Sequence, residues 1–145
     1  MKRILVAIDG SKASKKVVDY AVTLAKSMSA GITLLYVVPE LGVPRDYLQY
    51  AKEEKVDTAG YYDEVGRRIV EDFEKTVLAS GVDCEATYEI GPAFQKILAR
   101  IEESKAGLVV LGLRGLHGLG RVRALGSTAR RVMENSPVPV VIVPT

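Results

Sequence analysis

The sequence has few of the side chains that hold metals or carry out nucleophilic catalysis. Of its 145 residues one is cysteine and one is histidine, and tryptophan is absent. A single cysteine cannot close an internal disulfide, and a single histidine excludes a site built from several imidazoles. Cys84 stands in a segment that alternates apolar and polar residues. We therefore expect it to be a small strand side chain rather than a reactive thiol.

Long apolar runs and a strong net charge are also missing. No apolar stretch reaches the roughly 18 residues that a membrane-spanning helix needs, and Ile4–Ile8 is too short for the core of a signal peptide. We expect a cytoplasmic protein with no membrane partner. The net charge of +2 does not indicate nucleic acid, although residues 114–131 hold five arginines and no acidic residue. Such a local basic segment suits an anionic ligand.

Short apolar runs alternate with amphipathic segments along the chain. Residues 3–8 are apolar on both faces, as a parallel strand between two helical layers must be. Val82–Ile90 alternates and is expected at a sheet edge. The expected strands are 3–8, 32–38, 82–90, 107–111 and 138–143; the expected helices are 12–29, about 59–80, one beginning at Gly91-Pro92, and 127–135.

This order predicts an α/β fold in one domain, residues 1–145, with a doubly wound, mostly parallel sheet. Ser11 or Ser14 is expected to cap the first helix, and Gly81 to end the long one. We interpret residues 39–58 as a long, partly helical surface connection. In such sheets ligands bind beyond the carboxyl ends of the strands, where the strand order reverses.

Two strand ends carry residues suited to a ligand. Asp9-Gly10-Ser11 follows the first strand, and a glycine-rich loop runs from Gly112 to a helix start at Gly126-Ser127-Thr128. Glycine lets backbone amides approach a ligand, and a helix N-terminus favours anions. The loop therefore suits a polyphosphate, although Gly112 could simply end a strand and Ser127 could simply cap a helix. Its spacing fits neither the Walker motif nor G-x-G-x-x-G.

The polar residues near these strand ends leave several roles open. Asp9 could accept a hydrogen bond from a ribose hydroxyl, bind a metal through water, or cap the following helix. His117 is interpreted as a surface loop residue. The sequence offers no Ser-His-Asp set and no pair of carboxylates with evident catalytic placement. We therefore do not expect strong catalysis.

Four segments together resemble the universal stress protein family over nearly the whole chain: RILVAIDGS, GPAFQKIL, VVLGLRGLHGLG and GSTARRVMENSPVPVVIVPT. The resemblance implies a three-layer α/β/α fold, Rossmann-like and similar to the adenine nucleotide alpha hydrolases. Its five parallel strands would follow the order 3-2-1-4-5, with Asp9 and Gly112 facing one cleft. One branch of the family binds ATP through G-2x-G-9x-G-[ST]. Here ten residues separate Gly115 from Gly126, one more than in the motif.

The resemblance also implies roles for individual positions. The candidate nucleotide-binding residues are Ala7, Ile8, Asp9, Val37, Leu111, Gly112, Arg114, Gly115, Gly126, Ser127 and Thr128. The first four would surround the adenosine, and the next two would pass under the ribose and α-phosphate. The remainder would hold the phosphates, with Arg114, like Arg121 and Arg123, included for its charge. The implied cofactor is ATP, alone or with Mg²⁺.

Three functions follow as hypotheses. The first is an ATP-binding regulatory protein that changes conformation with ligand state and has at most slow ATP hydrolysis. The second is a nucleotide-independent interaction protein that works as a dimer, which the longer loop would favour. The third is a binder of nucleic acid or an anionic metabolite, which is disfavoured because no aromatic residues interleave with the arginines.

The last strand predicts a partner. Val138–Val143 is apolar on both faces and would lie at a sheet edge, where unpaired backbone groups invite another strand. We expect a homodimer in which a second copy pairs with this strand, as the resemblance also implies. Cover by the chain's own loop is the alternative.

Overall fold

Five strands form one parallel sheet in the computed structural model, which describes residues 3–38, 49, 52–53, 59–113 and 125–145. The elements run β1 (Arg3–Ile8), α1 (Ala13–Met28), β2 (Gly31–Val38), α3 (Ala59–Ala79), β3 (Cys84–Ile90), α4 (Ala93–Ser104), β4 (Leu108–Gly112), α5 (Ser127–Asn135) and β5 (Val140–Val143). The strand order is β3-β2-β1-β4-β5. This confirms the predicted fold class and the order that the resemblance implied. The predicted surface connection, 39–58, lies almost wholly outside the described residues.

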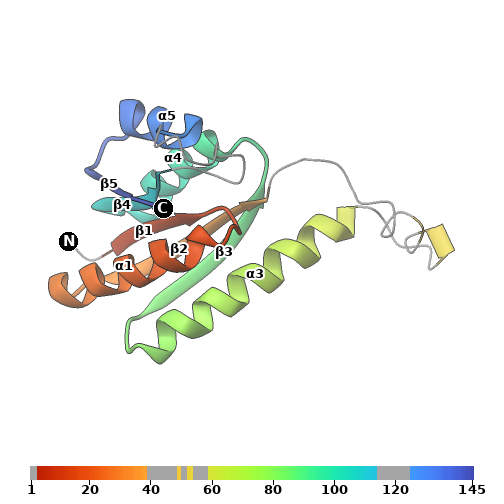
Figure 1. The fold of residues 1–145 in the computed structure, drawn as a ribbon, viewed down its shortest axis with the longest axis horizontal. Coiled ribbons are helices and arrows are strands. Elements are labelled where there is room, and N and C mark those ends of the chain that lie inside the picture. The colour runs from red at the N-terminus through yellow and green to blue at the C-terminus, as the bar shows by residue number, and fades with distance from the viewer. Residues whose placement is uncertain (1–2, 39–48, 50–51, 54–58, 114–124) are drawn as a thin grey trace.

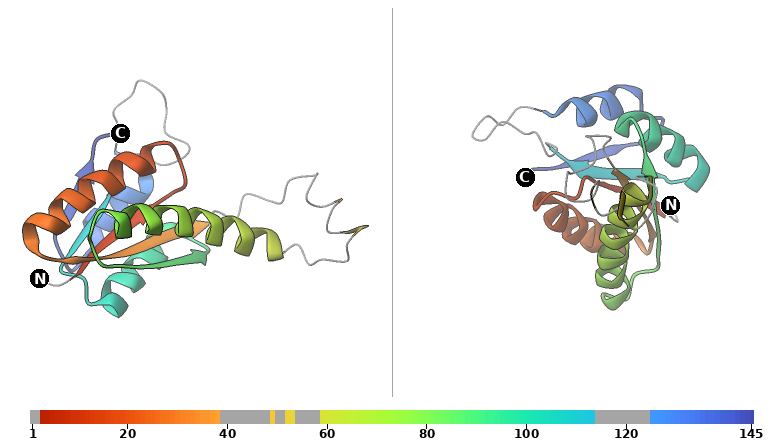
Figure 2. Two further views of the ribbon diagram at one scale, coloured as in Figure 1. Left: turned by 90° about the horizontal axis from the view of Figure 1, so that it is seen from below. Right: turned by 90° about the vertical axis from the view of Figure 1, so that its right-hand side faces the viewer.

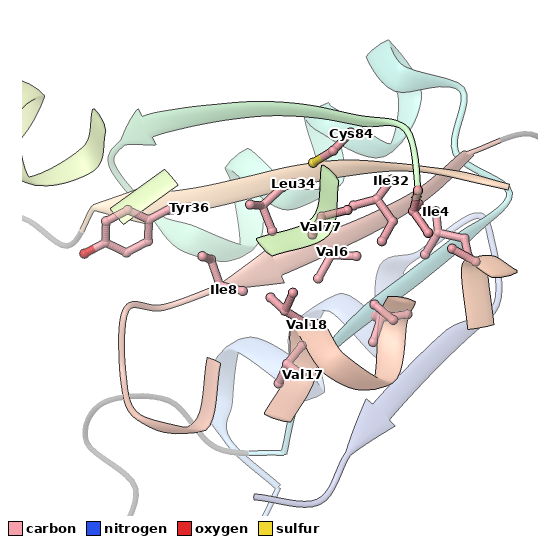
Figure 3. Close-up of a cluster of buried hydrophobic side chains, with 14 of the residues drawn as sticks. Ile4, Val6, Ile8, Val17, Val18, Ile32, Leu34, Tyr36, Val77 and Cys84 are labelled. Atoms are coloured by element: carbon pink, nitrogen blue, oxygen red, sulfur yellow. The ribbon is translucent and has the colours of Figure 1, made fainter. Parts of the chain in front are cut away.

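Helices cover both faces of the sheet, and the alternation of side chains along each strand divides the core into two layers. Ile4, Val6 and Ile8 of β1 pack with apolar residues of α1 and α3, and Leu5 and Ala7 pack with those of α4 and α5. Figures 1 and 2 show the two pairs of helices on opposite sides of the sheet. The first layer is drawn in Figure 3. Because β1 is apolar on both faces, it can occupy the centre of this arrangement.

Several predicted boundaries move by one or two residues. Strand β5 begins at Val140 rather than at 138, since Pro139 has no N–H to give to a ladder and contributes only its carbonyl, to the Val109 N–H. Strand β3 begins at Cys84 rather than at 82, and β4 covers 108–112 rather than 107–111. Both β3 and β5 lie at sheet edges, as predicted.

The predicted helix ends were partly right. Gly81 follows α3 with φ +90° and donates to the Leu78 carbonyl, which confirms it as part of the stop signal. The proposed caps of α1 were wrong: the N-cap position is Lys12, with no side-chain cap hydrogen bond. Pro92 occupies the N-cap of α4 rather than its first turn. In the described part of the chain no helix is both long and apolar enough to cross a bilayer.

Cys84 is a core residue of the layer beneath α1 and α3, with 8% of its surface exposed. Burial, together with the nearby carboxylates of Glu74 and Asp83, raises the pKa of its thiol to about 12. The thiolate is the reactive form of cysteine, so this environment keeps Cys84 inert. The prediction of a small structural strand side chain is confirmed.

We expect iodoacetamide to alkylate Cys84 at least about a hundredfold more slowly in the folded protein than in guanidinium chloride at the same mildly alkaline pH, because the folded thiol stays protonated. Mass spectrometry of timed samples measures both rates. Similar rates in the two states would show that the thiol is accessible and ionised in the fold.

Candidate functional site

The carboxyl edge of the sheet opens beside β1. The ladder between β1 and β2 continues to the pair Ile8–Tyr36, but the ladder between β1 and β4 ends at Val6–Val110. Strand β4 nevertheless continues to Gly112, where it pairs with β5. The last residues of β1 therefore lie next to a strand to which they are not bonded. This is the point of strand-order reversal at which ligands bind in open α/β sheets.

Asp9 organises the turn that leaves β1. Its Oδ1 atom accepts a hydrogen bond from the Ser11 N–H at 2.9 Å and another from the Ser14 hydroxyl at 3.1 Å. The Ser14 N–H in turn donates to the Ser11 carbonyl at 3.0 Å. The helix-capping role proposed for this carboxylate is thus partly realised, since Asp9 orders the start of α1 from outside the helix.

Gly10 lets the chain make this turn, because its φ is +78°. A Cβ atom at this position would lie 3.1 Å from the Tyr36 hydroxyl oxygen and 3.3 Å from Ile69 Cδ1. Figure 3 shows Tyr36 next to Ile8 at the end of the core layer. Burial, then the Asp9 carboxylate and Tyr61, raise the pKa of Tyr36 above its ordinary value. The hydroxyl therefore stays protonated beneath the turn.

The start of α5 is fastened to the same edge. The Gly126 N–H donates to the Leu113 carbonyl at 2.8 Å, and the Leu113 N–H donates to the Val143 carbonyl at 2.9 Å. If the β1–β4 register is extended beyond its last pair, Asp9 lies opposite Leu113. The turn after β1 and the start of α5 therefore lie on either side of the place where the β1–β4 ladder has ended, and we call this gap in the ladder the opening.

The first turn of α5 has backbone donors to offer. Gly126 is the N-cap, in extended conformation, and no side chain caps the helix. The alternative that Ser127 caps α5 is therefore wrong. Ser127 is exposed and Thr128 is half-buried. The amides of the first helical turn have no acceptor within the helix, and the helix dipole makes this end favourable for an anion.

The described site residues lie near the carboxyl ends of β1, β2 and β4 and at the start of α5, but the apolar ones are divided between two layers of the core. Ala7, Val37 and Leu111 belong to the layer under α4 and α5, whereas Ile8 faces α1 and α3. Asp9, Gly112, Gly126, Ser127 and Thr128 lie at the carboxyl edge. Arg114 and Gly115, with Arg121, Arg123 and His117, lie outside the described residues.

Sequence reasoning missed three contributors: Ser14 as a partner of Asp9, Tyr36 beneath Gly10, and the Leu113 carbonyl that fastens Gly126. A serine three positions after Ser11 and the one aromatic residue of β2 were visible signals. The pairing of Leu113 with Gly126 left none, because it joins backbone atoms. Over the ranges that the structure describes, no three His, Cys, Asp or Glu residues gather in a group able to hold a metal ion.

Comparison with known proteins gives a consistent result. The profile of the universal stress protein family matches residues 1–144. The universal stress protein YxiE of Bacillus subtilis is 35% identical over 145 aligned positions, and the alignment covers 97% of this chain and 97% of that one. The structure of universal stress protein UspA from Lactobacillus plantarum aligns with a TM-score of 0.74 at 25% identity, over 98% of this chain and 97% of that one.

Three other solved structures of similar fold are complexes with adenine nucleotides. A universal stress protein with cAMP has a TM-score of 0.67 at 22% identity, over 99% of this chain and 97% of that one. A family protein from Arabidopsis thaliana with AMP bound has a TM-score of 0.70 at 17% identity, over 99% of this chain and 92% of that one. A universal stress protein from Archaeoglobus fulgidus with dAMP has a TM-score of 0.65 at 18% identity, over 98% of this chain and 97% of that one. These likenesses show the shared fold.

The turn after β1 allows a test with a matched control. Gly81 also has a positive φ, but a Cβ there would meet nothing within 4 Å. We expect Gly81→Ala to cost about 1 kcal/mol for the left-handed backbone, and Gly10→Ala to cost about 1–2 kcal/mol more because of crowding against Tyr36. Urea unfolding measures both. Equal losses of stability in the two variants would show that the turn at Gly10 is not packed closely against Tyr36.

Proposed function

Because this chain belongs to the universal stress protein family, we propose that it binds an adenine nucleotide, ATP, in the opening between the carboxyl ends of β1 and β4. The observation that carries this proposal is the early end of the β1–β4 ladder at Val6–Val110, flanked by an acidic turn and a helix start. An opening with a hydrogen-bond acceptor on one side and amide donors on the other suits a nucleoside joined to phosphates.

The adenosine would occupy the inner part of the opening. Ala7, Val37 and Leu111 supply an apolar surface from three adjacent strands in the layer under α4 and α5. Strand β2 also extends beyond β1, since Val37 and Val38 pair only with β3. In a parallel ladder the pair Ile8–Tyr36 uses the Val37 N–H, so the Val37 carbonyl is the group of this extension that faces β1 without a ladder partner. Such a carbonyl can accept a hydrogen bond from the edge of a base.

The phosphates would lie at the start of α5. The N–H groups of Ser127, Thr128 and Ala129 begin the helix, and the Ser127 and Thr128 hydroxyls stand beside them. The Gly126 N–H already donates to Leu113, so Gly126 would contribute by having no side chain rather than by donating. We include Mg²⁺ as the companion of the triphosphate, because it prefers phosphate oxygens and water to a dedicated protein cage.

The nucleotides found with proteins of the same fold support an adenine nucleotide over other anions. The Asp9 carboxylate accepts two hydrogen bonds from its own turn, so its position is set by the fold, and the sequence offers no Ser-His-Asp set beside it. We therefore favour regulation, in which ATP shifts the population between conformations, over rapid turnover.

The proposed site can be tested by adding bulk where the phosphates would pass. Gly126 has φ −64° and ψ 156°, a backbone that valine also adopts. We expect Gly126→Val to weaken ATP binding at least about tenfold, or by 1.4 kcal/mol, by isothermal titration calorimetry. Ala79→Val, which adds a similar side chain at the exposed end of α3, should bind as the unmodified protein does.

Native mass spectrometry of the purified protein gives an independent reading, with a mass increase for bound ATP, ADP or AMP. A protein that purifies empty and takes up no nucleotide at millimolar MgATP would overturn the proposal. That result would favour an interaction protein that does not depend on nucleotide.

We also propose a homodimer through β5, the four-residue strand at one sheet edge. The Pro139 carbonyl accepts a hydrogen bond from Val109 of β4, and the Val143 carbonyl accepts one from Leu113, the residue after β4. Because residues of a parallel ladder alternate between neighbours, the N–H groups of Val140 and Ile142 face away from β4. The half-exposed valine and isoleucine side chains of this edge favour burial by a second copy.

Val140→Pro removes one outward N–H, whereas Val140→Ala keeps it. We expect light scattering after size exclusion to give twice the chain mass of 15.7 kDa for the unmodified protein and for Val140→Ala, and the monomer mass for Val140→Pro. Circular dichroism should be the same for all three. A monomer before any substitution would contradict the proposed dimer.

A further inference from the structure

The two oxygens of the Asp9 carboxylate are used unequally. Both internal donors, the Ser11 N–H and the Ser14 hydroxyl, reach Oδ1. Oδ2 has no hydrogen bond within the part of the chain that the structure describes. The Ser11 hydroxyl oxygen, in the same turn, is shielded from solvent and has no partner there either. Among the atoms of this turn, Oδ2 of Asp9 therefore has capacity for a further hydrogen bond at the edge of the proposed nucleotide site.

Ser14 is unusual among the described helical hydroxyl residues. Thr23, Ser27, Thr76 and Ser104 each donate to a carbonyl of their own helix. Ser14 donates instead to a carboxylate outside its helix. It is 2% exposed and, with Thr33, one of two polar side chains buried in the described part of the chain. A buried hydroxyl that holds one carboxylate oxygen fixes the rotation of the whole carboxylate.

We propose that Ser14 is a positioning residue which makes the site select nucleotides that carry ribose hydroxyls. By holding Oδ1 it keeps Asp9 in one orientation, with Oδ2 available as an acceptor for a hydroxyl of the ligand. This inference rests on the proposed nucleotide site and adds to it the class of sugar that the site recognises. It also separates the two uses of Asp9, since one oxygen orders α1 and the other meets the ligand.

The selectivity has a physical cause. A hydroxyl that donates to an ordered carboxylate forms a charge-assisted hydrogen bond, which is stronger than a neutral one. A nucleotide without ribose hydroxyls would cover Oδ2 and leave it unpaired, and an unpaired charged atom away from water is costly. If the carboxylate could rotate freely, it would lose order and could turn Oδ2 back toward solvent, so the discrimination would fall.

The experiment compares the dissociation constants of ATP and 2′,3′-dideoxy-ATP by calorimetry at fixed salt and Mg²⁺. The unmodified protein should favour ATP at least about tenfold, which corresponds to 1.4 kcal/mol. Ser14→Ala should bring the ratio of the two constants toward one. Asp9→Asn should do the same, because it retains an acceptor for Ser11 and Ser14 but replaces Oδ2 by a donor. Ser27→Ala, an exposed hydroxyl on the same helix, should leave the ratio unchanged.

The outcomes separate the inference from the function on which it rests. Equal affinity for the two nucleotides in the unmodified protein would overturn the inference and leave the nucleotide site standing. A Ser14→Ala protein that binds both more weakly, with the ratio unchanged, would also overturn it, by showing a merely structural role. Binding of neither nucleotide by the unmodified protein would overturn both proposals.

Discussion

The hydrogen bonding of β1 along both edges, under helices on both faces, determines where the candidate ligand contacts lie. The two ladders of β1 end at different residues: the ladder with β4 ends at Val6, and the ladder with β2 ends at Ile8. The chain that leaves β1 then turns close to the Tyr36 hydroxyl, where a positive φ and the short distance to a Cβ atom favour glycine at Gly10. On the other side of the opening, α5 is held to the end of β4 through the Leu113 carbonyl. The opening is therefore framed by backbone that the core holds in place.

The chemistry of this opening depends on one carboxylate that has two neighbours inside the protein and an unused second oxygen. We propose that the structural role of Asp9 and its binding role require each other. The bonds to Ser11 and Ser14 order the start of α1 and at the same time fix the acceptor. Burial and the Asp9 carboxylate raise the pKa of Tyr36, so the phenol beneath the turn stays neutral to a higher pH than a free tyrosine would.

The sequence was sufficient for the fold because β1, β2 and β4 are nearly continuous apolar runs and β3 alternates, as buried and edge strands must. The strand order came from the family resemblance, since periodicity does not say which strands are neighbours. At the site, Asp9 and Gly126 could be selected from their positions at an element's end. The contacts of Ser14 with Asp9 and of Tyr36 with Gly10 could not be predicted, because they depend on how side chains from different elements meet in the folded protein. The caps were misassigned for a similar reason: Asp9 acts on α1 from outside the helix.

We propose that the ligand lies between the end of β1 and the start of α5. Titration of isotopically labelled protein with MgATP, followed through backbone amide resonances, tests it most directly. We expect the largest shifts at residues 7–11, 37–38, 111–113 and 127–129, and no change in β3 or in the middle of α3. Shifts confined to β3 and α3, or none at saturating ATP, would contradict it.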